Sequence, residues 1–148
     1  MTTAVQTEEL LTPDQLRKIT RDAEAAEERK ANEEARKAEE HRKAARKAFM
    51  EREVRPDAMS YLMAGVKHAA EQGKHEFLVF QFPADELSDG GRRVNNMLPD
   101  WPESLEGFAK RAYAYYEQKL KPAHYKLRVQ ILDYPQGHLG DVGFFLCW

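Results

Sequence analysis

The chain of 148 residues suggests one domain with an appendage, and its net charge of −2 at pH 7 argues against a general attraction to nucleic acid or anionic membranes, although 32% of its residues are charged. Its single cysteine, Cys147, excludes an internal disulfide framework and fits a reducing compartment. The N-terminal residues lack an apolar signal-peptide core, and no apolar run approaches the roughly 18 residues of a membrane-spanning helix, so we expect a cytoplasmic protein.

Three segments differ in composition along the chain. We expect residues 1–12 to be disordered, residues 13–55 to form a long charged helix, called the arm, and residues 56–148 to form a small α/β domain. Apart from its first residue, Pro13, the arm contains neither glycine nor proline and is dominated by strong helix formers. Pro56 then disfavours a helical conformation at the residue before it. A helix of about 40 residues would be about 60 Å long.

The start of the arm carries several helix-initiation signals. Thr12 is placed to act as N-cap, with Pro13 at the first helical position and Gln15 where a capping box needs a glutamine. Leu11 and Leu16 occupy the two positions of a hydrophobic staple. These signals agree on a helix that begins at residue 13.

The middle of the arm nearly repeats every six residues between Glu27 and Ala44. This period spreads the alanines around the helix, whereas Glu33–Lys37 and Glu39–Lys43 are spaced for ion pairs along it. We therefore expect a solvated helix that supports itself. Thirteen acidic and thirteen basic side chains between residues 8 and 55 are a poor match for phosphate. A locally basic group is interpreted as part of the solvated surface: Arg42, Lys43, Arg46 and Lys47.

The two ends of the arm are more apolar than its middle. One stripe comprises Leu16, Ile19, Ala23 and Ala26, and a second patch comprises Ala45, Ala48, Phe49 and Met50. A spacer helix whose ends pack locally accounts for this pattern. A coiled-coil dimer is supported less, because the central core positions would be Lys30 and Glu33. Folding of the arm against a partner is the third alternative.

Five main elements are predicted in the domain, in the order α-β-α-β-β. The period-3.6 and period-2 patterns place two helices at 57–72 and 102–120 and three strands at 76–82, 125–133 and 142–148. The loop 83–99 is expected to contain one helical turn at 93–97. A crossover between the first two strands favours the strand order 1-3-2. We therefore predict an α+β fold with a three-stranded mixed sheet and helices on one face.

The first and last strands are apolar on both faces, which predicts cover on both sides of the sheet. Two helices cover one face only. The other face needs the base of the arm, the loop around Trp101, or a second protein. This reasoning predicts an interface that includes Phe49, Met50, Trp101, Phe145 and Trp148.

The segment Asp89–Arg93 is the most suggestive local motif. Gly90 and Gly91 free the backbone to form an anion-binding nest, and Arg92 and Arg93 supply charge for a phosphate or carboxylate. The spacing is not that of a P-loop or a dinucleotide fingerprint. A glycine turn that begins a short helix accounts for the same residues.

No catalytic residue, metal site or cofactor is predicted. The five histidines lack ligand spacing, and Cys147 has apolar neighbours typical of a packed thiol. Asp133, His138 and Asp141 cluster near the last turn, where Asp is also common for structural reasons. Lys126, Arg128 and Gln130, with Tyr125 beside them, offer a weak RNA platform, because no aromatic side chain lies on their wet face.

These observations lead to three functional hypotheses. The first is a non-enzymatic protein–protein interaction module that binds a partner or itself, with the arm as spacer or docking element. The second is a small-anion binder or enzyme that uses the loop Gly90–Arg93. The third is an RNA-binding accessory protein that uses Lys126 and Arg128.

Overall fold

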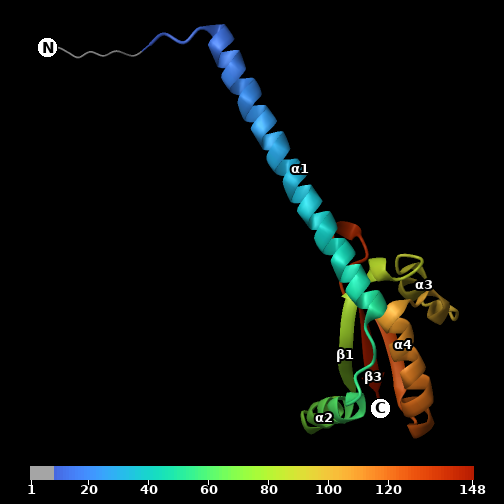
Figure 1. Cartoon of the computed structure of the whole chain (residues 1–148). Coiled ribbons are helices and arrows are strands. Elements are labelled where there is room, and N and C mark those ends of the chain that lie inside the picture. Colours follow the sequence, from blue (N-terminus) through green and yellow to red (C-terminus); the bar gives the residue numbers. More distant parts are fainter. Residues whose placement is uncertain (1–8) are drawn as a thin grey trace. The chain divides into compact units, whose positions relative to one another are not determined.

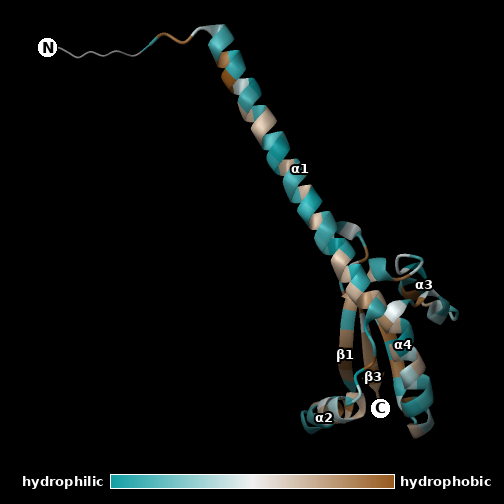
Figure 2. Cartoon of the chain, in the orientation of Figure 1, coloured by the Kyte–Doolittle hydropathy of each residue, from teal (hydrophilic) through white to brown (hydrophobic). Residues whose placement is uncertain are grey.

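The computed structural model of the chain describes residues 9–148, and most of the expected disordered segment, residues 1–8, lies outside them. The described chain forms two compact units that divide between Ala44 and Ala45. The first unit contains most of helix α1 (Pro13–Glu51), and the last turns of this helix belong to the second unit. Figure 1 labels the elements, and Figure 2 shows that α1 is hydrophilic along most of its length whereas β1 is apolar.

The capping box at the start of α1 forms as predicted. The Thr12 amide donates to Gln15 Oε1 over 2.8 Å, and the Gln15 amide donates to Thr12 Oγ1 over 3.2 Å. Because the two side chains satisfy amides that a helix leaves free at its start, they hold the N-terminus of α1 at Pro13. The C-terminus falls at Glu51, before the expected stop near Pro56.

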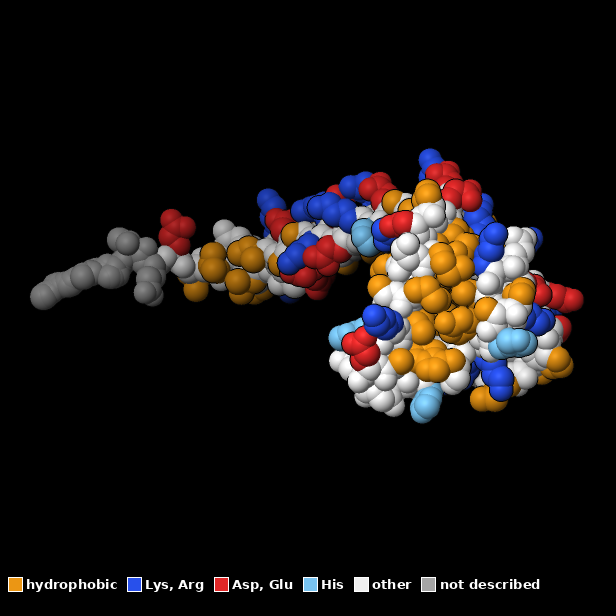
Figure 3. Space-filling model, turned by 90° about the horizontal axis from the view of Figure 1, so that it is seen from below, with side chains coloured by type: hydrophobic (Ala, Val, Ile, Leu, Met, Phe, Trp, Pro, Cys, Tyr) orange, Lys and Arg blue, Asp and Glu red, His pale blue; other side chains and the backbone are white. Residues whose placement is uncertain are grey.

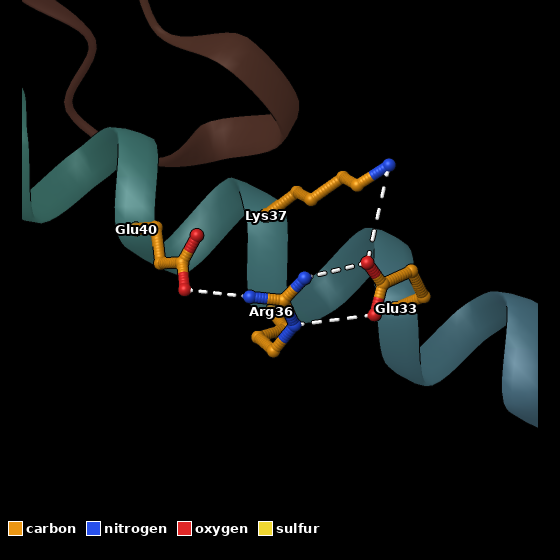
Figure 4. Close-up of polar contacts among 4 residues, drawn as sticks. All are labelled: Glu33, Arg36, Lys37 and Glu40. Carbon is orange, nitrogen blue, oxygen red and sulfur yellow. Dashed lines mark hydrogen bonds and ion pairs between the residues drawn. The ribbon is translucent and has the colours of Figure 1, made fainter.

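Ion pairs along the middle of α1 involve arginine more closely than lysine. The Arg36 guanidinium donates to Glu33 Oε1 over 2.5 Å and to Glu40 Oε1 over 2.6 Å, whereas Lys37 Nζ lies 3.9 Å from Glu33 Oε1 (Figure 4). Arg42 likewise lies 2.7 Å from the Glu39 carboxylate. These pairs run along the helix surface, and no residue of α1 is fully buried.

The sheet contains β1 (Glu76–Pro83), β2 (Lys126–Ile131) and β3 (Asp141–Cys147) in the order β1-β3-β2. The predicted fold class and strand order are confirmed. Both hydrogen-bonded pairs are antiparallel, so the expected mixed pairing does not occur. The reason is geometric: β1 and β2 run in the same direction, but β3 lies between them and runs opposite to both.

The helices cover one face of this sheet, as predicted. On β3 the residues that point to this face are fully buried: Val142, Phe144 and Leu146. Helix α2 (Ala58–Glu71) packs Leu62 and Val66 beside Leu146. Helix α4 (Gly107–Tyr115) places Ala109 in the cluster around Phe144. This face, called the helix face, contains the core of the domain.

The second long helix of the domain is shorter than predicted. Trp101–Ser104 forms a separate 3-10 turn, α4 begins at Gly107, and a π turn, Tyr116–Leu120, continues it. Gly107 has a φ of 54°, and a Cβ there would lie 2.8 Å from the Met50 Cα. The chain bends at this glycine because the end of α1 packs directly against it, so one helix cannot run from residue 102 to 120.

The long loop before α4 contains more regular structure than predicted. It holds a 3-10 turn, Ala84–Glu86, and the short helix α3 (Arg92–Asn95), which begins one residue before the predicted turn. Two more 3-10 turns, Lys121–Ala123 and Pro135–Gly137, flank β2. In residues 9–148 no helix combines the length and apolarity needed to cross a membrane.

Candidate functional site

A solvent-open apolar groove of about 150 Å³ lies on the helix face between α2 and α4, and we call it the α2–α4 groove. Figure 3 shows a broad band of hydrophobic side chains on the underside of the domain, the side where α2 lies in Figure 1. The floor comes from the sheet, the walls from α2, α4 and the π turn, and one end from the segment after α1. Its main lining residues are Arg52, Val54, Arg55, Tyr61, Leu62, Val79, Phe80, Phe108, Ala112, Tyr115, Tyr116, Leu127, Phe144 and Leu146.

An irregularity in β1 shapes the floor of the groove. Leu78 pairs with Phe145 and Phe80 pairs with Phe144, so Val79 is an extra residue in β1. Such a bulge changes the direction of neighbouring side chains. Val79 and Phe80 both line the groove as a result, although strict alternation would send them to opposite faces.

The charged residues among those that line the groove are two arginines at one end. The guanidinium of Arg52 lies 3.9 Å from the centroid of the Phe108 ring. Arg55 lies 5.4 Å from the Tyr61 ring and pairs with Asp57 over 2.9 Å. The groove therefore combines an apolar interior with a positive end.

The tyrosines of the π turn and α4 keep the groove uncharged elsewhere. Burial raises the pKa of Tyr116 above its ordinary value, so the phenol stays neutral at physiological pH. Its hydroxyl donates to the Tyr125 carbonyl over 2.8 Å. These groups offer shape and apolar surface, and they are not arranged as an acid–base pair.

Three of the five predicted interface residues are partly buried, and two of them, Phe49 and Trp101, pack against the core on the helix face. The Phe49 ring lies 5.1 Å from Phe82 and 6.4 Å from Phe108. The centroid of the Trp101 ring lies 5.4 Å from that of Tyr113 and 6.5 Å from that of Phe144. Met50 lies directly beside Gly107. Of the three candidates for covering the second face, the arm base and the Trp101 loop pack on the helix face instead.

The second face of the sheet, called the open face, holds Phe145 near its centre. Leu78, on the neighbouring strand, is 38% exposed, and Phe145 is half-buried beneath the Arg128 guanidinium at 4.4 Å. Trp148 lies beyond the end of β3 and is exposed. This face therefore retains the accessible apolar surface that the sequence predicts, with an arginine over part of it.

The basic residues of the proposed RNA platform also lie on the open face. The expectation that no aromatic side chain lies on this face was wrong, because Arg128 pairs with Phe145 across the strands and covers its ring. Arg128 pairs with Glu76 on β1 and donates to Gln130 Oε1 over 3.0 Å. The hydrogen bond that Arg128 donates to the Glu76 carboxylate raises the pKa of Arg128. Because the carboxylate neutralises the guanidinium, this face provides little attraction for phosphate.

The Gly90–Arg93 loop forms with its glycines in the left-handed region, as a nest requires, since φ is 68° at Gly90 and 93° at Gly91. The Asp89 carboxylate occupies the anion position. It accepts the amides of Gly91 and Arg93, each over 3.0 Å, and Arg93 also lies 3.3 Å from Asp100. Arg92 is exposed. The loop therefore satisfies its donors with the chain's own carboxylate.

The last turn and the cysteine show structural contacts instead of a catalytic arrangement. Asp133 accepts the Asp141 amide over 2.7 Å, and Asp141 accepts the Gln81 side-chain amide over 3.0 Å. Burial raises the pKa of the Cys147 thiol, which lowers its thiolate fraction. Within residues 9–148 no group of three or more His, Cys, Asp or Glu side chains is placed to hold a metal ion.

The groove was not predicted from the sequence. The aliphatic and aromatic residues that line it recur with the same spacing as residues of an ordinary core. Hydrophobic periodicity in the sequence therefore does not distinguish an open groove from a closed interior. Tyr115 and Tyr116, adjacent in the chain and both on its wall, are the one unusual signal. Arg52 and Tyr61 carried no signal at all.

Comparison with known proteins gives no relative from which a function could be inferred. No family model matches the chain, and no curated protein and no solved structure matches it.

Proposed function

We propose that this protein is a non-enzymatic protein–protein interaction module whose α2–α4 groove binds an apolar segment of a partner. The observation that carries this proposal is the apolar groove between two helices, where lining residues such as Val79, Ala112 and Tyr115 keep part of their surface accessible to solvent. Exposed apolar concavities lined by aromatic side chains are typical of binding sites, and burial of one large side chain can dominate the affinity of an interface.

The size of the groove suggests what it holds. A volume of about 150 Å³ is close to that of a cavity which accepts one benzene ring. The groove therefore fits one leucine-sized or aromatic side chain, with the rest of the partner segment across the rim. The aromatic walls supply contact area at low conformational cost, since tyrosine and phenylalanine have few rotatable bonds.

The arm fits this role as a spacer or docking element. It has no fully buried residue, and ion pairs such as those of Arg36 stabilise it along its own surface. A helix that needs no core of its own can present a binding domain at a distance or contact a partner directly. A coiled-coil pairing of the arm and a cytoplasmic location stay predictions from the sequence.

Selection of displayed peptides on the immobilised full-length protein tests the groove. We expect the enriched peptides to share one large apolar side chain. Replacement Ala112→Phe places a ring in the groove and should weaken these peptides by at least about tenfold. Ala58→Glu, which puts a charge on the lining from α2, is a second blocking variant in case the first does not fold.

Ala114→Phe is the matched control, because Ala114 lies on the same helix but is exposed. It should leave peptide affinity unchanged. Circular dichroism and thermal melting confirm that each variant folds. Failure to enrich any peptide, or peptides that bind the blocked and control variants equally, would remove the proposal.

Anion binding and RNA binding are supported less. Asp89 already occupies the Gly90–Arg93 loop, and Glu76 already neutralises Arg128. Either function requires that an external phosphate displace a carboxylate held by the same chain. The α2–α4 groove needs no such displacement.

A further inference from the structure

The most exposed large hydrophobic side chain among residues 9–148 is Leu10, just before α1. It is 90% exposed, and its neighbour Leu11 is 50% exposed. Leu16 and Ile19 follow on the first turns of the helix and are also exposed. These four side chains form an apolar segment at the start of α1 that stays largely accessible to solvent.

The charges of this segment complement those of the groove. Residues 9–16 contain Glu9 and Asp14 and no basic side chain. Of the charged side chains that line the groove, Arg55 already pairs with Asp57 over 2.9 Å, so Arg52 is the charge that the groove offers to a ligand. Asp14 also contacts Arg17, but this pair is highly exposed and contributes little free energy. Arg17 and Lys18 follow directly, so the acidic character is confined to residues 9–16, and this leucine-containing stretch complements the Arg52 end of the groove.

We infer that residues 9–16 of a second copy of this chain dock in the α2–α4 groove, with Leu10 inserted as the anchor beside Arg52. The inference rests on the proposed function of the groove and specifies its occupant. Leu10 precedes the capping box at Thr12, so it can enter a groove without disturbing the start of α1. One leucine side chain matches the available volume.

Arg52 is suited to receive the acidic residue of this segment. Its guanidinium carbon lies 3.9 Å from the centroid of the Phe108 ring in a cation–π contact, and its N–H groups are hydrogen-bond donors for a carboxylate. A carboxylate from Glu9 or Asp14 of the second copy would pair with it at the mouth of the groove. Two such contacts, exchanged between two chains, would close a two-fold dimer.

Light scattering across the micromolar range tests the inference on the full-length protein. The unmodified chain should approach twice the mass of one chain as its concentration rises. Leu10→Asp removes the anchor, and Ala112→Phe blocks the groove, so each variant alone should stay monomeric. Met97→Asp is the matched control, because Met97 is another highly exposed hydrophobic residue, 87% exposed, outside the segment; it should dimerise like the unmodified protein.

Mixing the two monomeric variants provides a complementation test. Leu10→Asp keeps an open groove and Ala112→Phe keeps an intact segment, so an equimolar mixture should regain a 1:1 complex through one contact. A labelled peptide of residues 9–22 should likewise bind the Leu10→Asp chain. Its affinity for the Ala112→Phe chain should be at least about tenfold weaker. Dimerisation of the unmodified protein without complementation would place the contact elsewhere and overturn the inference.

The outcomes separate this inference from the proposed function. If the protein stays monomeric and the 9–22 peptide does not bind, while selected peptides still bind in an Ala112-dependent manner, the groove is a binding site and its occupant is another protein. If neither selected peptides nor the 9–22 peptide bind, both proposals fail together.

Discussion

The guanidinium of Arg46 donates a hydrogen bond of 3.1 Å to the carboxylate of Glu86, a side chain that is only 10% exposed. A second nitrogen of the same group donates to Glu106 over 3.1 Å. From its charged neighbours in the sequence, Arg46 is expected to lie on a solvated basic surface. That interpretation was wrong for this residue, because it satisfies two carboxylates of the domain from the last turns of α1.

Replacement Arg46→Ala should therefore destabilise the protein. Glu86 would keep its burial but lose its charged partner, and we expect a loss of about 1–3 kcal/mol in the free energy of unfolding. Urea denaturation followed by circular dichroism measures it. The control is Arg36→Ala, which removes two ion pairs on the exposed part of α1. It should leave the midpoint of urea denaturation nearly unchanged, because exposed ion pairs contribute little to stability. Equal midpoints for the two variants would contradict the structural role of Arg46.

Replacement Gly107→Ala tests the close approach between α1 and α4. The new Cβ would meet Met50 Cα at 2.8 Å and the Phe49 carbonyl oxygen at 2.9 Å, in addition to the cost of a positive φ. Gly73→Ala is the control, since Gly73 also has positive φ but has open space around it. The control should cost about 1–2 kcal/mol from the backbone alone. The melting temperature of Gly107→Ala should fall clearly below that of Gly73→Ala. Equal melting temperatures for the two variants would mean that α1 and α4 are not in close contact at this glycine.

Removal of the Asp89 carboxylate should convert the Gly90–Arg93 loop into a true anion site. In Asp89→Ala the amides of Gly91 and Arg93 lose their acceptor, so the variant should be less stable by about 1–2 kcal/mol. Inorganic phosphate should raise the melting temperature of this variant more than that of the unmodified protein, with chloride at equal ionic strength as control. A phosphate-dependent rise of equal size in both proteins would favour the anion-binding hypothesis instead.

The Cys147 thiol should react slowly with alkylating reagents in the folded protein. Burial raises its pKa, so at pH 8 a smaller fraction is thiolate than in the unfolded chain, and the thiolate is the reactive form. The alkylation rate with iodoacetamide should rise through a higher pH range in the folded protein than in guanidinium chloride. A raised pKa means that the thiol stays protonated, and therefore unreactive, up to a higher pH in the folded protein than in the unfolded chain. Equal pH profiles in both states would contradict this.

Local structure was predictable wherever neighbouring residues decide it. Thr12 and Gln15 fix the start of α1 because a capping box involves only residues three positions apart. The strands and α2 appear close to their predicted bounds, because hydrophobic periodicity reports which face of each element is buried. Strand order also followed from sequence, since a crossover and a hairpin leave few arrangements of three strands.

The tertiary structure alone decided what depends on residues distant in the chain. Helix α4 begins only at Gly107, although the local sequence predicts a helix from residue 102, because the end of α1 lies against this glycine. Arg46 looks like any other solvated arginine until Glu86 and Glu106 lie beside it. The α2–α4 groove likewise arises from a gap between helices that the hydrophobic pattern cannot record, since a side chain has the same sequence signature whether its apolar surface faces a neighbour or an open groove.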